Sequence, residues 1–209
     1  MLLVIVRHGE TDANISRVLQ GHLDSELSLR GILQVKKLAE RLEEKKFDQI
    51  FCSDLIRARQ TAAAILQGRN TPIVYRSELR ERSYGVYQGQ PLEKFEEALK
   101  NSGQSREEFC PEKGESYLDV EKRVATFLDE IFATHESQSV LLVAHGGTNR
   151  VILKQLLQKS FSEVFRIEQN NTCINEIDIA VSSKTIVAQT LNCTAHLSSR
   201  MFTPFGIQE

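Results

Sequence analysis

Two uninterrupted aliphatic runs, residues 2–6 (LLVIV) and 140–144 (VLLVA), constrain the fold of this 209-residue chain more than any other feature. A strand with one exposed face alternates apolar and polar residues, whereas a strand covered on both faces is aliphatic throughout. We therefore expect both runs to be central strands of a sheet that has helices on both sides.

The rest of the chain alternates between helical and strand patterns. Helices are predicted over residues 28–46, 53–67, 117–134 and 148–158, with further strands at 49–52 and 73–75. Near the end, an alternating segment at 173–179, a turn at 182–183 and a strand at 185–191 predict a β-hairpin. This order is typical of an α/β fold whose sheet is largely parallel and has an antiparallel C-terminal edge.

Serines mark the expected starts of two helices. Ser28 precedes the helix over 28–46 and Ser53 precedes the helix over 53–67, and a serine hydroxyl accepts hydrogen bonds from the free N–H groups of a first helical turn. On the first helix, five apolar residues recur at helical spacing and are expected to face the sheet. These residues are Leu29, Ile32, Leu33, Leu38 and Leu42.

The composition excludes several classes of protein. Lys and Arg (26) nearly balance Asp and Glu (28), for a formal net charge of −2, which argues against a nucleic-acid binder that relies on bulk positive charge. No segment approaches the roughly 20 apolar residues of a membrane span. The four cysteines are far apart, so we expect them to be reduced and the protein to be cytoplasmic. No linker divides the chain, which predicts a single domain over residues 1–209.

Two histidines stand in matching contexts. His8 and a following glycine come directly after the first aliphatic run, and His145 and two glycines come directly after the second. Because ligands bind beyond the carboxyl ends of the strands in such sheets, both side chains are expected at one crevice. The alternative is a pair of buried, hydrogen-bonded structural histidines.

Two arginines suggest what such a crevice binds. Arg7 precedes His8, and Arg57 lies in the first turn of a predicted helix, where the helix N-terminus also favours an anion. Guanidinium groups match phosphate oxygens, so a phosphoryl group held there would face an imidazole nucleophile. The competing chemistry is a metal site, but the zinc-type Cys/His spacings, H-E-x-x-H and the nucleotide-binding glycine loops are absent from the sequence.

Phosphoryl transfer from an ester also needs a proton for the departing alkoxide. Glu81, in the segment that follows the strand at 73–75, is the carboxyl candidate for this general acid. A surface ion pair with Arg80 or Arg82 is the alternative role for Glu81.

Five blocks of sequence resemble the histidine phosphatase (phosphoglycerate mutase-like) superfamily, in the order of that family. They are RHGETDAN at 7–14, SDLIRARQTA at 53–62, LRERSYGVYQG at 79–89, KGESYLDVEKRV at 113–124 and LLVAHGG at 141–147. The resemblance implies a three-layer αβα sandwich with a mostly parallel six-stranded sheet and a short helical cap, formed by an insertion at about 90–115. It implies no metal and no organic cofactor.

The resemblance also implies roles for individual residues. His8 would be the phosphorylated nucleophile, Glu81 the proton donor, and Arg7, Arg57 and His145 the rest of the phosphate pocket. By position, Asn14, Gln20 and Gly21 match a loop that contacts substrate or phosphate, and Gly146 matches a backbone donor. Tyr84 is either a substrate contact or a packed aromatic.

Phosphatase and mutase activities remain alternatives within the family. The segment from Gln90 to Ser116 is shorter than the mutase insertion, and it carries one arginine, Arg106, with scattered lysines. The segment ERSYG resembles the mutase form. We favour hydrolysis of small phosphate monoesters, in a branch similar to broad-specificity and fructose-2,6-bisphosphatase-like phosphatases, on the segments QGHLDSELSLRG and LNCTAHL. The substrate would be a sugar phosphate, a sugar bisphosphate or a phosphoglycerate.

A catalytically inactive phosphate-binding regulatory module is the other class of function considered. The expected partner is a small phosphorylated metabolite, with no nucleic acid or membrane, and the protein would be a monomer or homodimer. Among the remaining histidines, His22 lies either at the site mouth or in solvent, His135 is expected on the surface, and His196 is a further candidate near the site. Cys52 is expected in the core.

Overall fold

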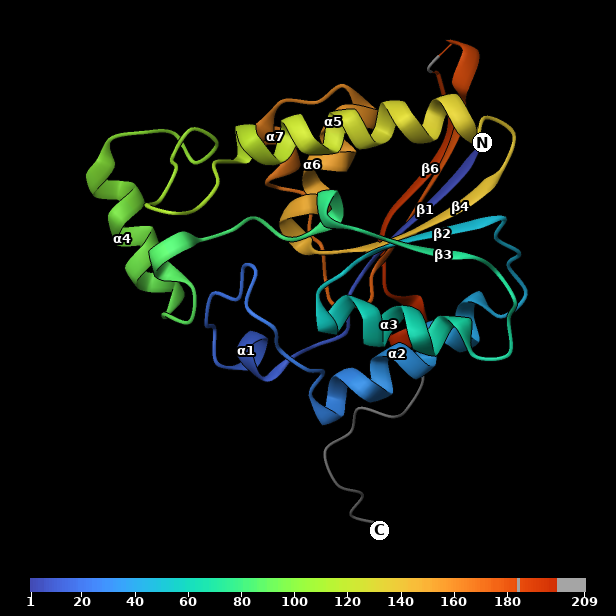
Figure 1. The fold of residues 1–209 in the computed structure, drawn as a ribbon, viewed down its shortest axis with the longest axis horizontal. Coiled ribbons are helices and arrows are strands. Elements are labelled where there is room, and N and C mark those ends of the chain that lie inside the picture. The colour runs from blue at the N-terminus through green and yellow to red at the C-terminus, as the bar shows by residue number, and fades with distance from the viewer. Residues whose placement is uncertain (184, 199–209) are drawn as a thin grey trace.

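The computed structural model describes residues 1–183 and 185–198, and in them six strands form one sheet in the order β3-β2-β4-β1-β5-β6 (Figure 1). The strands are β1 (Leu2–Arg7), β2 (Gln49–Ser53), β3 (Ile73–Arg76), β4 (Ser139–Ala144), β5 (Ile174–Ala180) and β6 (Thr185–Cys193). The first four run parallel to one another, whereas β5 is antiparallel to β1 and β6 is antiparallel to β5. The predicted sheet, hairpin included, is confirmed.

The two aliphatic runs pair side by side at the centre of the sheet. β1 and β4 are parallel and in register, with Ile5 opposite Leu142. Side chains alternate between faces, so Leu3 and Ile5 enter one hydrophobic cluster while Val4 and Val6 enter the other. Residues 3–6 are fully buried, as a strand covered on both faces must be.

Helices cover both faces of the sheet and complete the predicted three-layer sandwich (Figure 1). One layer contains α2 (Leu29–Leu42) and α3 (Ile56–Leu66), and the other contains α5 (Tyr117–Thr134), α6 (Gly146–Leu157) and α7 (Phe161–Val164). Within residues 1–183 and 185–198, no helix combines the length and the apolar character that crossing a membrane requires.

The predicted face of α2 is partly wrong. Leu38 and Leu42 are buried, but Leu29 is 85% exposed, and Ile32 and Leu33 also point away from the core. The buried stripe is made by Gly31, Gln34, Val35, Leu38 and Leu42. Gly31 determines this orientation, because a Cβ there would lie 2.0 Å from the carbonyl oxygen of Glu10. The close approach of the two backbones at Gly31 therefore decides which face of α2 is buried, although it leaves three apolar side chains exposed.

Of the two predicted N-caps, one is confirmed and one is wrong. Ser28 accepts a hydrogen bond from the amide of Gly31 at 3.0 Å, as an N-cap should. Ser53 instead ends β2, and α3 begins at Ile56 without a capping side chain from its own segment. Asp24, from a distant loop, accepts from the amide of Ile56 at 3.1 Å. This replacement explains why a local cap is unnecessary.

Residues 90–115, called the cap below, lie beside the ends of β1 and β4 and not over a face of the sheet (Figure 1). The cap contains α4 (Leu92–Ser102), and its Phe95 and Phe109 form a small cluster with Leu19. Arg82 joins this cluster to the sandwich. It is fully buried, lies over the ring of Phe95 at 5.1 Å and donates to the carbonyl oxygen of Phe109.

Candidate active site

A cavity of about 140 Å³, called the site cavity below, opens beyond the carboxyl end of β1. Its lining is Arg7, His8, Asn14, Val18, Leu19, Gln20, Gly21, Arg57, Glu81 and Tyr84. Every predicted site residue is in this lining except His145 and Gly146. His145 lies next to it, with its ring centroid 5.1 Å from that of His8. The fold thus brings the predicted residues from distant segments to one place.

His8 presents one ring nitrogen that has no hydrogen-bond partner among residues 1–183 and 185–198. Its Nδ1 lies 2.7 Å from the carbonyl oxygen of Gly9, and because a carbonyl only accepts, Nδ1 is the protonated nitrogen. Burial, followed by the positive charges of Arg57 and Arg7, holds the pKa of His8 well below 6.5. The ring is therefore neutral at neutral pH, and its Nε2 carries the lone pair that a nucleophile needs.

His145 has the opposite tautomer. Its Nδ1 accepts from Nε of Arg57 at 3.2 Å, so Nε2 carries the proton and donates to the hydroxyl of Ser53 at 2.8 Å. Burial and the nearby charge of Arg57 hold its pKa well below 6.5 as well. Both ring nitrogens are thus occupied. If His145 is part of the phosphate pocket, as the resemblance implies, its Nδ1 can donate to a phosphoryl oxygen only after taking up a proton, which the charge of a bound anion favours.

Arg57 is held in a fixed orientation. Its Nη1 donates to the carbonyl oxygen of Leu23 at 2.9 Å and its Nη2 to that of Gly21 at 2.7 Å. Burial lowers the pKa of Arg57 to about 10, which leaves the side chain positively charged at neutral pH. The carbonyl contacts use one N–H of each terminal nitrogen, so further N–H groups remain for a ligand.

Two polar atoms of the lining are buried without a hydrogen-bond partner among the described residues. They are Nε of Arg7 and Oε1 of Gln20. The other end of Arg7 is fixed, because its Nη1 donates to the carbonyl oxygen of Gln169 at 2.6 Å. An unmade buried hydrogen bond costs about 1–3 kcal/mol, so a ligand with an acceptor for Arg7 and a donor for Gln20 would satisfy both atoms.

Glu81 is positioned by two backbone amides. Its Oε1 accepts from the amide of Arg82 at 2.9 Å, and its Oε2 accepts from the amide of Gly147 at 3.0 Å, in the first turn of α6. The alternative of a surface ion pair is wrong. Arg80 pairs with Asp54 at 2.5 Å, and Arg82 donates to backbone carbonyl groups.

The remaining predicted residues combine structural contacts with access to the cavity. Asn14 completes a capping box with Thr11, and only its amide oxygen is used in hydrogen bonds to the described residues. Gly21 has a positive φ of 51°, and a Cβ there would lie 2.3 Å from Oε1 of Gln88. Gly146 is the first residue of α6, next to the guanidinium of Arg7. Tyr84 both lines the cavity and packs edge-on against Phe95.

The other candidate histidines lie outside the lining. His22 donates from Nε2 to the carbonyl oxygen of Glu81 at 2.8 Å, so it supports the segment that carries the carboxyl group. His196 is buried, and its Nε2 lies 3.2 Å from the hydroxyl of Thr172, whose amide donates to the carbonyl oxygen of His8. His135 follows α5 and is half-buried, with its ring edge-on against Phe51, so it lies at the surface as expected but is only partly exposed. Cys52 is in the core as predicted.

Several supporting residues escape sequence reasoning. Ser53 binds His145, Gln169 binds Arg7, and Thr61 accepts from the amide of Gly9 at 3.0 Å. None of the three belongs to a pattern that indicates its partner. Gly147 has a signal in the doubled glycine after His145, because a Cβ at this position would lie 2.4 Å from Oε1 of Glu81.

Size alone does not identify the site. A larger cavity of about 170 Å³ lies between α5, α6 and β6, with a mostly apolar lining that includes Leu128, Phe132 and Ile186. Its lining contains neither histidine nor arginine. As for metals, residues 1–183 and 185–198 contain no group of three or more His, Cys, Asp or Glu side chains that could hold an ion.

Comparison with known proteins identifies the family. Residues 3–192 match the family model of the histidine phosphatase superfamily (branch 1). An adenosylcobalamin/α-ribazole phosphatase of Salmonella typhimurium is 32% identical over 195 residues, which cover 89% of this chain and 94% of that protein. A broad-specificity phosphatase of Saccharomyces cerevisiae is 32% identical over 208 residues, which cover 96% of this chain and 89% of that protein. The crystal structure of the α-ribazole phosphatase from Shigella flexneri matches with a TM-score of 0.83 at 28% identity, over 92% of this chain and 96% of that chain.

The fold and the site cavity, taken with these matches, show that the chain belongs to branch 1 of the histidine phosphatase superfamily. It is a phosphoric monoester hydrolase, similar to the broad-specificity phosphatases of this family. The resemblance recognised in the five sequence blocks is thereby confirmed.

Proposed function

We propose that this enzyme hydrolyses small phosphate monoesters through a phosphohistidine on His8, with Glu81 as the proton donor. The observation that carries the proposal is the hydrogen bond from Nδ1 of His8 to the carbonyl oxygen of Gly9. It leaves the lone pair on Nε2, in a cavity that Arg7 and Arg57 also line. The substrates are sugar phosphates, sugar bisphosphates or phosphoglycerates.

In the first step, Nε2 of His8 attacks phosphorus and the bond between phosphorus and the ester oxygen breaks. The departing alkoxide takes a proton from Glu81. The imidazole becomes positively charged as the N–P bond forms, and the bond from Nδ1 to Gly9 stabilises that charge. Arg7 and Arg57 stabilise the charge on the equatorial oxygens.

In the second step, water attacks the phosphoryl group and gives a proton to the Glu81 carboxylate. The N–P bond breaks, and phosphate leaves with His8 neutral again. The same carboxyl group thus donates a proton in one step and accepts one in the other, as microscopic reversibility requires. Its two amide contacts support this role because they hold the group in one orientation.

Turnover of p-nitrophenyl phosphate tests the proposal. We expect His8→Ala to abolish turnover and the acid-labile phosphoenzyme, while His135→Ala, remote from the site cavity, keeps both. Glu81→Gln should lose about 10²–10⁴-fold on an alkyl phosphate but much less on p-nitrophenyl phosphate, whose leaving group needs no proton. Wild-type protein that is inert on a panel of phosphate esters would instead support the regulatory module and overturn the proposal.

Phosphoglycerate mutase activity is the second candidate, because the segment ERSYG resembles the mutase form. Against it, Arg106 of the cap pairs with Glu96 at 2.8 Å, and the cap lysines Lys94, Lys100 and Lys113 are not in the cavity lining. Assays of 3-phosphoglycerate with and without 2,3-bisphosphoglycerate distinguish the two activities. Isomerisation faster than phosphate release would make the enzyme a mutase.

A further inference from the structure

We infer that the site cavity selects phosphate monoesters whose alcohol part is uncharged and offers a hydrogen-bond donor, over those that carry a second anionic group. This inference rests on the proposed function and narrows its substrate class. It comes from how charge is distributed in the lining and from one buried acceptor.

The charged groups of the lining surround the reacting phosphoryl group. Arg7 and Arg57 flank His8, and Glu81 is the carboxyl group that handles the proton. The other lining residues are neutral: Asn14, Val18, Leu19, Gln20, Gly21 and Tyr84. Among these, Leu19 and Tyr84 pack in the same cluster as Phe95 of α4, so the wall that adjoins the cap is apolar.

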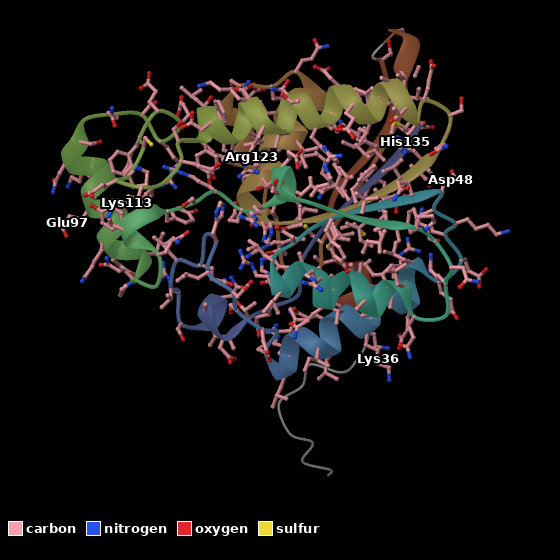
Figure 2. The ribbon with its side chains drawn as sticks, in the orientation of Figure 1. Lys36, Asp48, Glu97, Lys113, Arg123 and His135 are labelled. Carbon is pink, nitrogen blue, oxygen red and sulfur yellow. The ribbon has the colours of Figure 1, made fainter. Side chains whose placement is uncertain are left out.

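The arginines around this wall have protein partners. Arg82 is fully buried outside the lining, lies over the ring of Tyr84 and donates to the backbone carbonyl oxygens of Glu115 and Phe109. The other two pair with carboxylates. Arg80 pairs with Asp54 at 2.5 Å, and Arg123 pairs with Glu115 at 3.0 Å. Arg123 belongs to α5 and is labelled just below that helix in Figure 2. It also donates to the carbonyl oxygen of Glu81 at 3.2 Å.

The cap adds no free arginine to the wall, since Arg106 pairs with Glu96. Lys113 lies in the cap, well away from the sheet (Figure 2). No cation in the described part of the lining is therefore available for a second phosphate or a carboxylate.

Gln20 indicates what the alcohol part offers. Its Oε1 is buried, lines the same cavity and has no hydrogen-bond partner among the described residues. An amide oxygen is satisfied by a hydroxyl or an N–H group and not by a carboxylate. A neutral alcohol with a donor group fills this position, whereas an anionic substituent would enter a partly desolvated wall without a counter-ion, near the Glu81 carboxyl group.

Glycerol 3-phosphate and 3-phosphoglycerate form a matched pair, because they differ only by a hydroxymethyl group in place of a carboxylate. We expect kcat/KM for glycerol 3-phosphate to exceed that for 3-phosphoglycerate by about tenfold or more. Equal values or the reverse order would overturn the inference. p-Nitrophenyl phosphate is the reference in each assay: if it is not turned over either, the proposed function fails and not merely the selectivity.

Two variants test the residues that the inference uses. Val18→Lys places a cation on the neutral wall and should shift the ratio of the matched pair toward 3-phosphoglycerate by about tenfold, while Val18→Met leaves that ratio unchanged. Gln20→Leu removes the acceptor and should lower kcat/KM for glycerol 3-phosphate relative to p-nitrophenyl phosphate by about tenfold. Unchanged ratios in both Val18→Lys and Gln20→Leu would overturn the inference, because neither the neutral wall nor the Gln20 acceptor would then contribute to selection.

Discussion

His8 and His145 hold their protons on different ring nitrogens because their partners differ. A backbone carbonyl group faces Nδ1 of His8, whereas a guanidinium N–H faces Nδ1 of His145. A carbonyl requires a donor and a guanidinium requires an acceptor, so the first ring is protonated at Nδ1 and the second at Nε2. Only the first arrangement leaves Nε2 unprotonated at the cavity.

Nitrogen-15 NMR of the imidazoles checks this assignment. Because burial and the two arginines lower both pKa values, we expect His8 and His145 to remain neutral at pH 6.5, with opposite tautomers. His8→Ala and His145→Ala assign the signals. A midpoint at or above pH 6.5 for His8, or a proton on its Nε2, would contradict the proposed nucleophile. The lowered pKa of His8 also predicts the pH dependence of activity: protonation of His8 removes activity only well below pH 6.5.

Sequence reasoning locates these residues but not their hydrogen bonds. The strand patterns and following glycines predict that His8 and His145 meet at one crevice. The tautomers depend on the carbonyl of Gly9 and on the orientation of Arg57, which the carbonyl groups of Gly21 and Leu23 hold. Such backbone contacts involve any residue type, so no sequence pattern marks them.

The first turn of α6 holds the proton donor, because the amide of Gly147 donates to Glu81. This contact predicts the effect of Gly147→Ala. A Cβ there would lie 2.4 Å from Oε1 of Glu81, so the carboxyl group must move. We expect kcat/KM for an alkyl phosphate to fall at least about tenfold, with a smaller loss on p-nitrophenyl phosphate, because a displacement of about 1 Å already costs about 10²-fold. Steady-state kinetics with the two substrates measures the difference.

Gly103→Ala is the control for this variant. Gly103 follows α4 with a φ of 68°, so alanine there strains the backbone and lowers stability, but its Cβ meets nothing within 4 Å and does not touch Glu81. It should leave the ratio between the two substrates unchanged. Equal losses on both substrates in Gly147→Ala would mean that the glycine supports the fold of α6 and does not position Glu81.

The position of a helix in the chain can be predicted from sequence more reliably than the face that it buries. The boundaries predicted for α5 match the structure, because apolar periodicity and a serine capping box both occur within the segment. The predicted face of α2 is only partly right, since two residues of the buried stripe, Gly31 and Gln34, are not apolar. Their partners lie in a separate loop: the amide of Glu10 donates to Oε1 of Gln34 at 2.9 Å. A helical pattern contains no information about such a loop.

Across the whole molecule the net charge is close to zero, and the positive charge that matters for an anion is concentrated at the site cavity. Lys and Arg (26) nearly cancel Asp and Glu (28), yet Arg7 and Arg57 place positive charge beside two neutral histidines. The chain thus builds an anion site without bulk positive charge. Burying the two neutral imidazoles beside these cations also links the stability of the fold to pH.

This linkage predicts that the free enzyme loses stability as the pH falls below 6.5. In the unfolded chain both histidines take up protons near pH 6.5, while in the folded chain their pKa values are well below that. The stabilisation is therefore complete above pH 6.5 and is lost as the pH falls, by about 1.4 kcal/mol per pH unit for each ring that stays neutral. Urea unfolding at about pH 7.5 and about pH 5.5 measures the slope. The double variant His8→Gln and His145→Gln should have a clearly shallower slope, and an equal slope would mean that other groups carry the pH dependence.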